Sequence, residues 1–190
     1  MTGSAAIDVL IGGDGADTLI GNGGADVLRG GAGDDDLVVT DANFAKLDGG
    51  SGDDALVLSG GVTLDLTALA DTYIEDVENI DFTGGATTLT LNASDVRAMS
   101  ETNTLTITGA GTDVVLSSDE WSAEGTVVIG PDTFDKYTLS GATVLVDVDV
   151  DSSSLPPPLP EPPTNLDFVA LGTGGFKVIG ENAGDKAGRF

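Results

Sequence analysis

A nine-residue pattern of glycine, aspartate and leucine at the start of the chain constrains its fold more than any other feature. Residues 3–38 divide into four units, GSAAIDVLI, GGDGADTLI, GNGGADVLR and GGAGDDDLV, and a fifth unit, GGSGDDALV, spans residues 49–57. A unit this short cannot bury its own apolar side chains, whereas stacked units share a core. The pattern therefore predicts a solenoid. Each unit has Asp at its sixth position and Leu at its eighth: Asp8, Asp17, Asp26, Asp35 and Asp54, and Leu10, Leu19, Leu28, Leu37 and Leu56.

The composition of each unit predicts a turn followed by a short strand. Six Gly-rich residues permit a tight turn with positive φ, and the last three residues alternate around an inward Leu. We expect two units to make one coil, so that like turns recur every 18 residues along the sequence. Asp8 would then stack on Asp26, and Asp17 on Asp35.

A ten-residue interruption, VTDANFAKLD at residues 39–48, separates the fourth unit from the fifth. Counted as one long unit, it keeps Leu47 roughly in phase and places Asp35 and Asp54 on the same edge of the stack. Ala45 occupies the place of the acid in this count, so we expect an irregular or missing site there.

The charge of the chain indicates what could hold such turns together. Acidic residues outnumber basic ones by 32 to 7, which gives a formal charge of −25. Carboxylates stacked at the strand spacing of about 4.8 Å would repel one another without a counter-ion. Because carboxylates are hard oxygen donors, we expect a hard divalent cation such as calcium between the turns.

Composition also excludes several classes of function. The acidic charge disfavours a nucleic-acid partner. The chain has neither Cys nor His, which excludes disulfides, thiol nucleophiles, the usual catalytic triads and His- or Cys-based zinc sites. No run approaches the roughly 20 apolar residues of a membrane span. The start, MTGSAAIDVLI, lacks the features of a cleaved signal peptide, so export would use another signal, or the chain is a fragment of a larger protein.

The units resemble the RTX calcium-binding repeat, G-G-x-G-x-D-x-U-x. Those at 12–20, 30–38 and 49–57 match in full, whereas the unit at 21–29 departs at its second and third positions. The resemblance implies a calcium-stabilised parallel β-roll, or RTX solenoid, over residues 1–58. The ligands that it implies are the carbonyls at the second and fourth positions and the carboxylate at the sixth: Gly13, Gly15 and Asp17; Asn22, Gly24 and Asp26; Gly31, Gly33 and Asp35; Gly50, Gly52 and Asp54; and Asp8, whose turn lacks the glycines.

The sequence of residues 59–150 predicts a β-rich region that continues or caps the stack of repeat units. Residues 68–80 also fit a helix, and residues 93–100 predict a short helix capped by Asn92 or Ser94. The region resembles segments that follow RTX repeats in large secreted bacterial adhesins. Its β-branched runs, separated by turn signals, are VTLDL (62–66), TTLTLN (87–92), TLTIT (104–108), DVVLS (113–117), GTVVIG (125–130) and ATVLVDVDV (142–150).

The composition changes after residue 150. Residues 151–164 hold six of the seven prolines, which predicts a semi-rigid linker and a domain boundary. In the last segment, 165–190, GGFKVIGENAGDKAGRF resembles the first half of an FG-GAP repeat, the unit of integrin-type β-propellers. The resemblance implies a partial repeat that is poorly ordered, because half a blade cannot bury a face.

We therefore expect an all-β, non-catalytic, calcium-binding module of a secreted or cell-surface bacterial protein, exported by type I secretion and folded by calcium outside the cell. Its role would be structural or adhesive, with cell-surface or extracellular ligands bound through domains outside this chain. The alternative is the C-terminal export and folding tail of a secreted hydrolase. Because neither HExxH nor GxSxG occurs here, the catalytic domain of such an enzyme would lie outside this chain. Ice binding is disfavoured because the outward turn positions carry no ladder of Thr or Asn.

Overall fold

The computed structural model describes residues 1–156, 167–171 and 175–179. The chain divides into two compact units, residues 1–158 and 159–190, and each is described by itself. Among the described residues the only helices are short, and strands make up about half of the first unit. The prediction of an all-β chain is confirmed.

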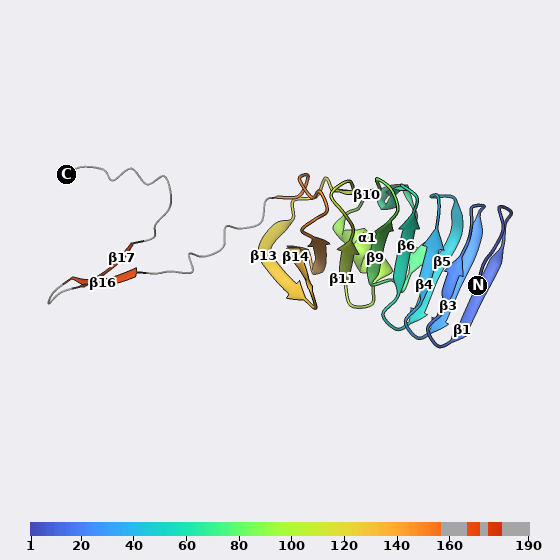
Figure 1. The fold of residues 1–190 in the computed structure, drawn as a ribbon, viewed down its shortest axis with the longest axis horizontal. Coiled ribbons are helices and arrows are strands. Elements are labelled where there is room, and N and C mark those ends of the chain that lie inside the picture. The colour runs from blue at the N-terminus through green and yellow to red at the C-terminus, as the bar shows by residue number, and fades with distance from the viewer. Residues whose placement is uncertain (157–166, 172–174, 180–190) are drawn as a thin grey trace. The chain divides into compact units, whose positions relative to one another are not determined.

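Two parallel sheets form the first part of the unit, and the chain alternates between them (Figure 1). The register pairs Leu10 with Leu28 and Leu19 with Leu37, a step of 18 residues. Two nine-residue units per coil predict this step. One sheet, called the first sheet, contains β1 (Val9–Asp14), β3 (Asp26–Ala32), β5 (Phe44–Ser51) and β8 (Ile74–Glu75). The other, called the long sheet, contains β2 (Thr18–Ile20), β4 (Asp36–Val39), β6 (Ala55–Ser59), β9 (Asn79–Thr83) and β11 (Thr104–Thr108), followed by three strands described below.

The leucine at the eighth position of each unit points into the space between the two sheets. Leu19, Leu28 and Leu37 have no exposed surface, and Leu10, in the first coil, is 9% exposed. These side chains join one continuous apolar core that runs through the unit. Burial of each leucine stabilises the fold by about 1.5–3 kcal/mol, which offsets the poor strand propensity of the glycines.

The ten-residue interruption is accommodated by an irregularity between β3 and β5. Asp26 pairs with Phe44, and Val27 pairs with Lys46, so Ala45 is the extra residue. The expectation that Ala45 takes the place of the acid is wrong, because the buried Phe44 stands opposite Asp26 and Ala45 is exposed. The bulge restores the phase, and Leu47 pairs with Leu28 as expected.

After residue 59 each coil gains a third side. The step between paired residues of the long sheet grows to 24 residues from Leu56 to Ile80 and to 27 from Ile80 to Ile107. The added residues form a third parallel sheet and two short helices: β7 (Thr63–Asp65), β10 (Thr88–Thr90) and β12 (Val114–Leu116), with the 3-10 helix η1 (Leu66–Ala68) and the α-helix α1 (Ala93–Met99).

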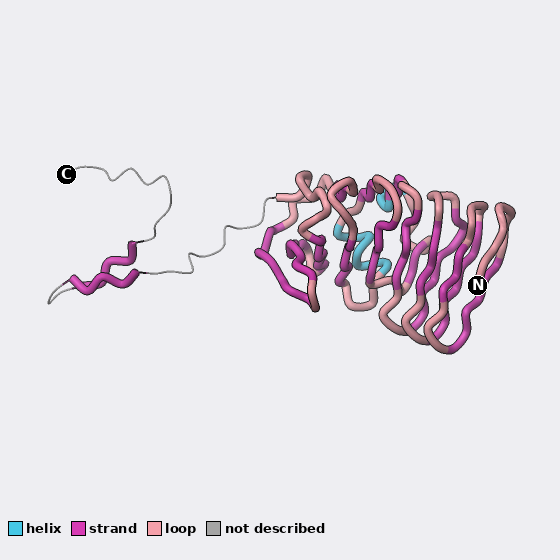
Figure 2. The backbone as a smooth tube through the Cα atoms, in the orientation of Figure 1, coloured by secondary structure: helices cyan, strands magenta, loops and turns pink. Residues whose placement is uncertain are grey.

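The helical alternative for residues 68–80 is wrong. The 3-10 helix ends at Ala68, and the following residues form β8, a turn and β9. Asp76 has φ of 53°, which ends the short strand β8. Residues 93–100, in contrast, contain α1 as predicted, and Figure 2 shows it in the middle of the unit, where it packs against β8, β11 and β15.

Three further strands close the long sheet at its C-terminal end. β15 (Ala142–Asp147) pairs with β11 in parallel, and β14 (Asp132–Leu139) and β13 (Ser122–Ile129) follow in antiparallel pairing. The β-branched runs of the sequence do not include β14. Its two buried side chains, Phe134 and Tyr137, are three residues apart, and this spacing departs from the alternation that marks a half-buried strand.

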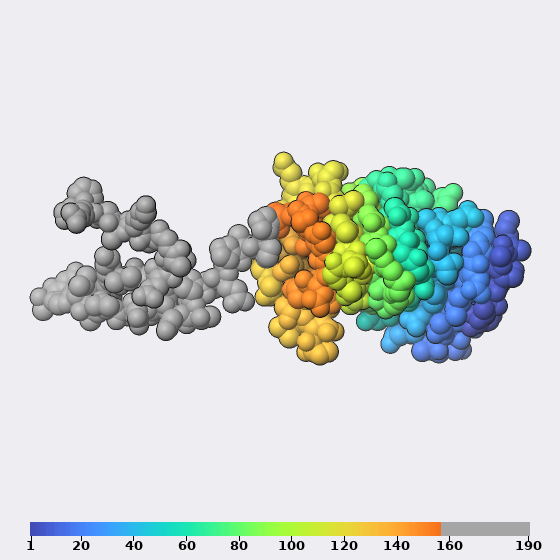
Figure 3. Space-filling model, turned by 45° about the horizontal axis from the view of Figure 1, so that its top comes forward, coloured from blue at the N-terminus to red at the C-terminus, as the bar shows by residue number. Residues whose placement is uncertain are grey.

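The ordered stack continues into the start of the Pro-rich segment. Asp151 pairs with Val114, and Leu155 is only 4% exposed. In the space-filling view, successive coils follow one another as bands of colour up to this segment (Figure 3).

In the second unit, β16 (Asp167–Leu171) pairs with β17 (Gly175–Ile179) in an antiparallel sheet. The rest of the expected propeller segment 165–190 and residues 157–164 of the expected linker lie outside the described residues. The resemblance to an FG-GAP repeat therefore stays a prediction.

Candidate metal centre

The Gly-rich turns of the repeat stack along two edges of the coil. Turns that lead from the first sheet to the long sheet, here called the first edge, are residues 12–17, 30–35 and 49–54. Turns that lead back, the second edge, are residues 3–8 and 21–26. The structure brings Asp17, Asp35 and Asp54 together at the first edge, and Asp8 and Asp26 at the second.

Each of these aspartates is hydrogen-bonded to a neighbouring coil. The N–H of Asp17 donates to Oδ1 of Asp35 at 2.7 Å, and the N–H of Asp35 donates to Oδ1 of Asp54 at 2.8 Å. At the second edge the N–H of Asp8 donates to Oδ1 of Asp26 at 2.9 Å. One carboxylate oxygen of each acceptor is thus used to hold neighbouring turns in register.

The second carboxylate oxygen distinguishes the aspartates from one another. Oδ2 of Asp8 accepts hydrogen bonds from the N–H and the hydroxyl of Ser4, at 2.6 and 2.9 Å, and these bonds lower the pKa of Asp8. Oδ2 of Asp35 and Oδ2 of Asp54 are buried and have no hydrogen-bond partner in the described part of the chain. The two residues are 1% and 0% exposed.

A buried carboxylate oxygen without a partner is unfavourable, because the charge loses its hydration and gains nothing in exchange. Burial raises the pKa of the Asp54 carboxyl to about 6, against the lowering effect of the Asp35 N–H, and neighbouring carboxylates add to the rise. A bound cation would remove this penalty.

The first glycine of each turn leaves room for two oxygens that approach the same point. A Cβ on Gly12 would lie 2.5 Å from the carbonyl oxygen of Gly30 and 2.7 Å from Oδ2 of Asp17. On Gly30 it would meet the carbonyl oxygen of Gly49 and Oδ2 of Asp35 in the same way. A carboxylate oxygen and a carbonyl oxygen from successive coils therefore flank a space that any other residue would fill.

Three of the expected carbonyl ligands at the first edge lie against the next turn of the stack. The carbonyl oxygen of Gly13 faces Gly31 of the next coil, that of Gly31 faces Gly50, and that of Gly33 faces Gly52. This orientation depends on positive φ, which favours glycine. The φ values at the first edge are 116° for Gly13, 98° for Gly15, 121° for Gly31, 120° for Gly33, 104° for Gly50 and 150° for Gly52.

The second edge is less regular. Asn22 has φ of 65° and Gly24 has φ of 108°, and the Asn22 amide donates to the carbonyl oxygen of Gly3 at 3.2 Å. The carbonyl oxygen of Ala6 faces Gly24. The stack of acids ends at Asp26, because Phe44 follows it in the next coil.

This donor set suits Ca²⁺, which takes six to eight oxygen ligands from carboxylates and carbonyls in flexible geometry. Among the described residues no three acidic side chains form a metal-binding group, so the backbone carbonyls must supply a large share of the ligands. The two ion pairs of the described part, Arg29 with Asp48 and Lys46 with Glu75, do not include the stacked aspartates.

Residues 2–37 match the family model of the RTX calcium-binding nonapeptide repeat (4 copies). The segment is an RTX-type repeat. Calcium is the ion that such repeats bind, and the buried Oδ2 of Asp35 and the carbonyls facing along the stack agree with it. No curated protein matches the chain.

Sequence reasoning missed two acidic residues that behave like the sixth-position aspartates. The N–H of Asp54 donates to Oε2 of Glu78 at 3.2 Å, and the N–H of Thr87 donates to Oδ1 of Asp113 at 2.7 Å. Both acids stand two residues before a buried side chain of a strand, Ile80 or Val115, as Asp54 stands before Leu56. This spacing, an acid two residues before a buried strand residue, is the sequence signal that could have identified them. Oδ2 of Asp113 also accepts from the N–H of Ala110 at 2.9 Å, so both oxygens of this carboxylate have partners in the protein.

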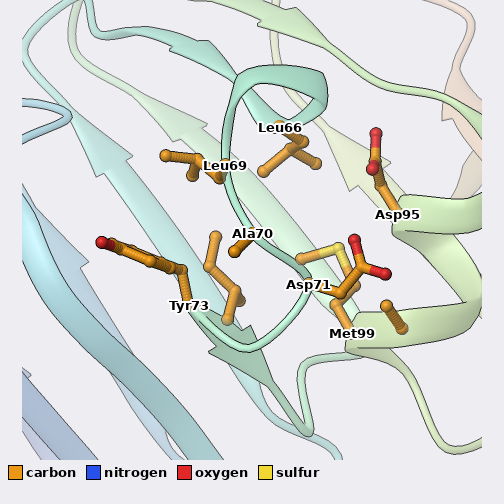
Figure 4. A pocket seen from close by; sticks show the side chains of 9 residues that line it. Leu66, Leu69, Ala70, Asp71, Tyr73, Asp95 and Met99 are labelled. Atoms are coloured by element: carbon orange, nitrogen blue, oxygen red, sulfur yellow. The ribbon is translucent and has the colours of Figure 1, made fainter.

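A small hollow lies between η1, the residues after it, and α1 (Figure 4). Leu66, Leu69 and Met99 line it with apolar surface, and Oδ2 of Asp95 accepts the N–H of Asn92 at 2.8 Å. The ring of Tyr73 points away from Asp95 (Figure 4). Asp71 also lines the hollow, so it holds two carboxylates, those of Asp71 and Asp95. No helix in the described part of the chain has the length and apolar character that a membrane crossing requires.

Proposed function

We propose that this chain is a non-catalytic module of a secreted or cell-surface protein, in which calcium between stacked turns stabilises a parallel β-roll. The observation that carries the proposal is that, in the described part of the chain, two buried carboxylate oxygens have no hydrogen-bond partner: Oδ2 of Asp35 and Oδ2 of Asp54. The side chains of Asp17, Asp35 and Asp54 would hold the ions, together with the glycine carbonyls of the same turns. Bound calcium supplies charge neutralisation and cross-links successive coils.

Calcium binding and folding would then be one equilibrium, because the turns form only when the coils stack. Without calcium the net charge of −25 opposes compaction. Extracellular modules of this kind bind calcium at roughly 10⁻⁴–10⁻³ M. The chain would stay unfolded in a calcium-poor cytosol and fold after export, which suits type I secretion.

The proposal includes adhesion, which domains outside this chain would carry out. The resemblance of residues 59–150 to adhesin segments and the FG-GAP-like tail support it. The described part of the chain would serve as a spacer that calcium makes rigid.

Circular dichroism and urea denaturation, with EDTA or about 5 mM calcium, test the proposal on the wild type and on Asp35→Asn. The variant keeps an oxygen for the Asp17 N–H but removes the charge. We expect it to lose much of the calcium-induced folding, whereas in EDTA its folded fraction should equal or exceed that of the wild type, because the unpaired buried anion is gone.

The control is Asp36→Asn, which makes the same charge change at an exposed neighbour on β4 and should behave like the wild type. Magnesium should act weakly, because Mg²⁺ demands a small octahedral site. A wild type with the same spectra in EDTA and calcium would contradict the proposal.

A further inference from the structure

The row of stacked acids at the first edge does not end with the repeat. Ala55 pairs with Asn79 and Leu56 pairs with Ile80, which places Glu78 in the next coil at the position of Asp54. The N–H of Asp54 donates to Oε2 of Glu78 at 3.2 Å. Glu78 therefore accepts the same hydrogen bond that Asp54 accepts from Asp35.

The turn that carries Glu78 differs from the glycine turns that precede it. Leu47 pairs with Ile74 and Asp48 pairs with Glu75, so Asp76 stands opposite Gly49. Three residues, 76–78, stack on the six residues of the turn at 49–54. The shorter turn explains the longer side chain, since glutamate has one more methylene than aspartate with which to reach Asp54.

The oxygens around Gly49 repeat the arrangement of the earlier turns. A Cβ on Gly49 would lie 2.7 Å from Oδ2 of Asp54 and would also meet the carbonyl oxygen of Asp76. Asp76 takes the place that a first-position glycine has elsewhere. Its positive φ of 53° belongs to the turn that presents this carbonyl.

Two features indicate that a cation binds here. Asp54 has no exposed surface, its Oδ2 has no partner in the described part of the chain, and this oxygen and the carbonyl oxygen of Asp76 both lie close to Gly49. The outer acids are already engaged: the Asp53 N–H donates to Oδ1 of Asp34 at 3.0 Å, and Oδ1 of Asp53 accepts from Asn79 at 2.8 Å.

We propose that Asp54, Glu78 and the carbonyl oxygen of Asp76 form a calcium site that joins the last repeat turn to the following coil. This inference rests on the proposed function, but its residues lie outside the segment that matches the repeat model, 2–37. A calcium ion here fastens the repeat to the three-sided coils after residue 59, so that binding at the repeat is coupled to the order of the rest of the unit.

Calcium titration of the metal-free full chain by isothermal calorimetry tests the site. Glu78→Gln keeps an acceptor for the Asp54 N–H and removes the negative charge. We expect this variant to bind one calcium fewer per chain than the wild type and to need a higher calcium concentration for half-folding. Glu120→Gln, the same change at an exposed residue, should match the wild type in both measurements.

Circular dichroism at saturating calcium checks that Glu78→Gln still folds. Glu78→Asp keeps the charge but shortens the side chain, and it should also lose or weaken the site. An unchanged stoichiometry in folded Glu78→Gln would overturn this inference while leaving the repeat sites intact. A wild type that binds no calcium would instead overturn the proposed function itself.

Discussion

At the scale of single residues, glycine at the second position of a turn has two separate roles, and the structure offers a pair of positions that separates them. Gly13 and Gly31 have nearly the same backbone, with φ of 116° and 121°. A Cβ on Gly13 would have no neighbour within 4 Å, whereas a Cβ on Gly31 would overlap the carbonyl oxygen of Gly13 and lie 3.0 Å from its carbon. Gly13 is needed only for its backbone conformation, whereas Gly31 is also needed because a side chain there would overlap the neighbouring coil.

We expect Gly13→Ala to reduce the free energy of unfolding by about 1–2 kcal/mol, the strain of a left-handed alanine. Gly31→Ala should lose that amount and a further ~1–3 kcal/mol, because the coils must move apart. Urea denaturation in saturating calcium measures both. Equal losses in the two variants would show that the close stacking of the carbonyl on Gly31 does not matter for stability.

At the scale of elements, α1 shows how a short helix is maintained inside a β stack. The side chain of Asn92 accepts the N–H groups of Ser94 and Asp95 at 2.8 and 3.0 Å, and Asp95 accepts the N–H of Asn92 at 2.8 Å. This reciprocal pair is a capping box. Of the two caps that the sequence allowed, the structure uses Asn92.

Asn92→Ala should therefore lower the free energy of unfolding by about 1 kcal/mol. Ser94→Ala, two residues further on, should change it by less than about 0.5 kcal/mol, because Ser94 is exposed. Chemical denaturation in calcium compares the two. A larger loss for Ser94→Ala would mean that the hydroxyl, and not the amide, holds the first turn.

At the scale of the whole molecule, the acidic composition makes stability depend on pH. Burial raises the pKa of Asp81, which also accepts the Thr108 hydroxyl, and burial raises the pKa of Asp95. A carboxyl whose pKa is higher in the folded than in the unfolded chain stabilises the fold at low pH, and this contribution is lost as pH rises through the folded pKa. Protonation at low pH also reduces the net negative charge of the chain, and the weaker repulsion stabilises the fold as well.

In EDTA, acidification from neutral pH should therefore raise the folded fraction measured by circular dichroism. Asp81→Asn should reduce this response, since its amide does not titrate and still offers an oxygen to Thr108. Asp132→Asn, at an exposed position of β14, should keep the response of the wild type. A folded fraction that falls on acidification in EDTA would contradict the expected direction.

Local information was enough to predict the repeat. Each nine-residue unit carries its own turn glycines, inward leucine and aspartate, so the period alone predicts that Asp17 stacks on Asp35 and that Leu19 packs beside Leu37. The hydrogen bond from Asp17 to Asp35 and the full burial of both leucines agree with that prediction. The short helix at 93–99 was predictable for the same reason, because its cap lies next to it in sequence.

The sequence by itself determined the period of the stack, the inward leucines, the acidic edges and the preference for a hard cation, because these depend on neighbours within one unit. Only the tertiary structure decided that Phe44 follows Asp26 in the stack, that Glu78 continues the row of acids, and that the Asp8 carboxylate is satisfied by Ser4 while that of Asp35 is not. Those outcomes depend on how many residues each coil contains before it returns to the long sheet, and coil length is set by packing between segments that are distant in sequence.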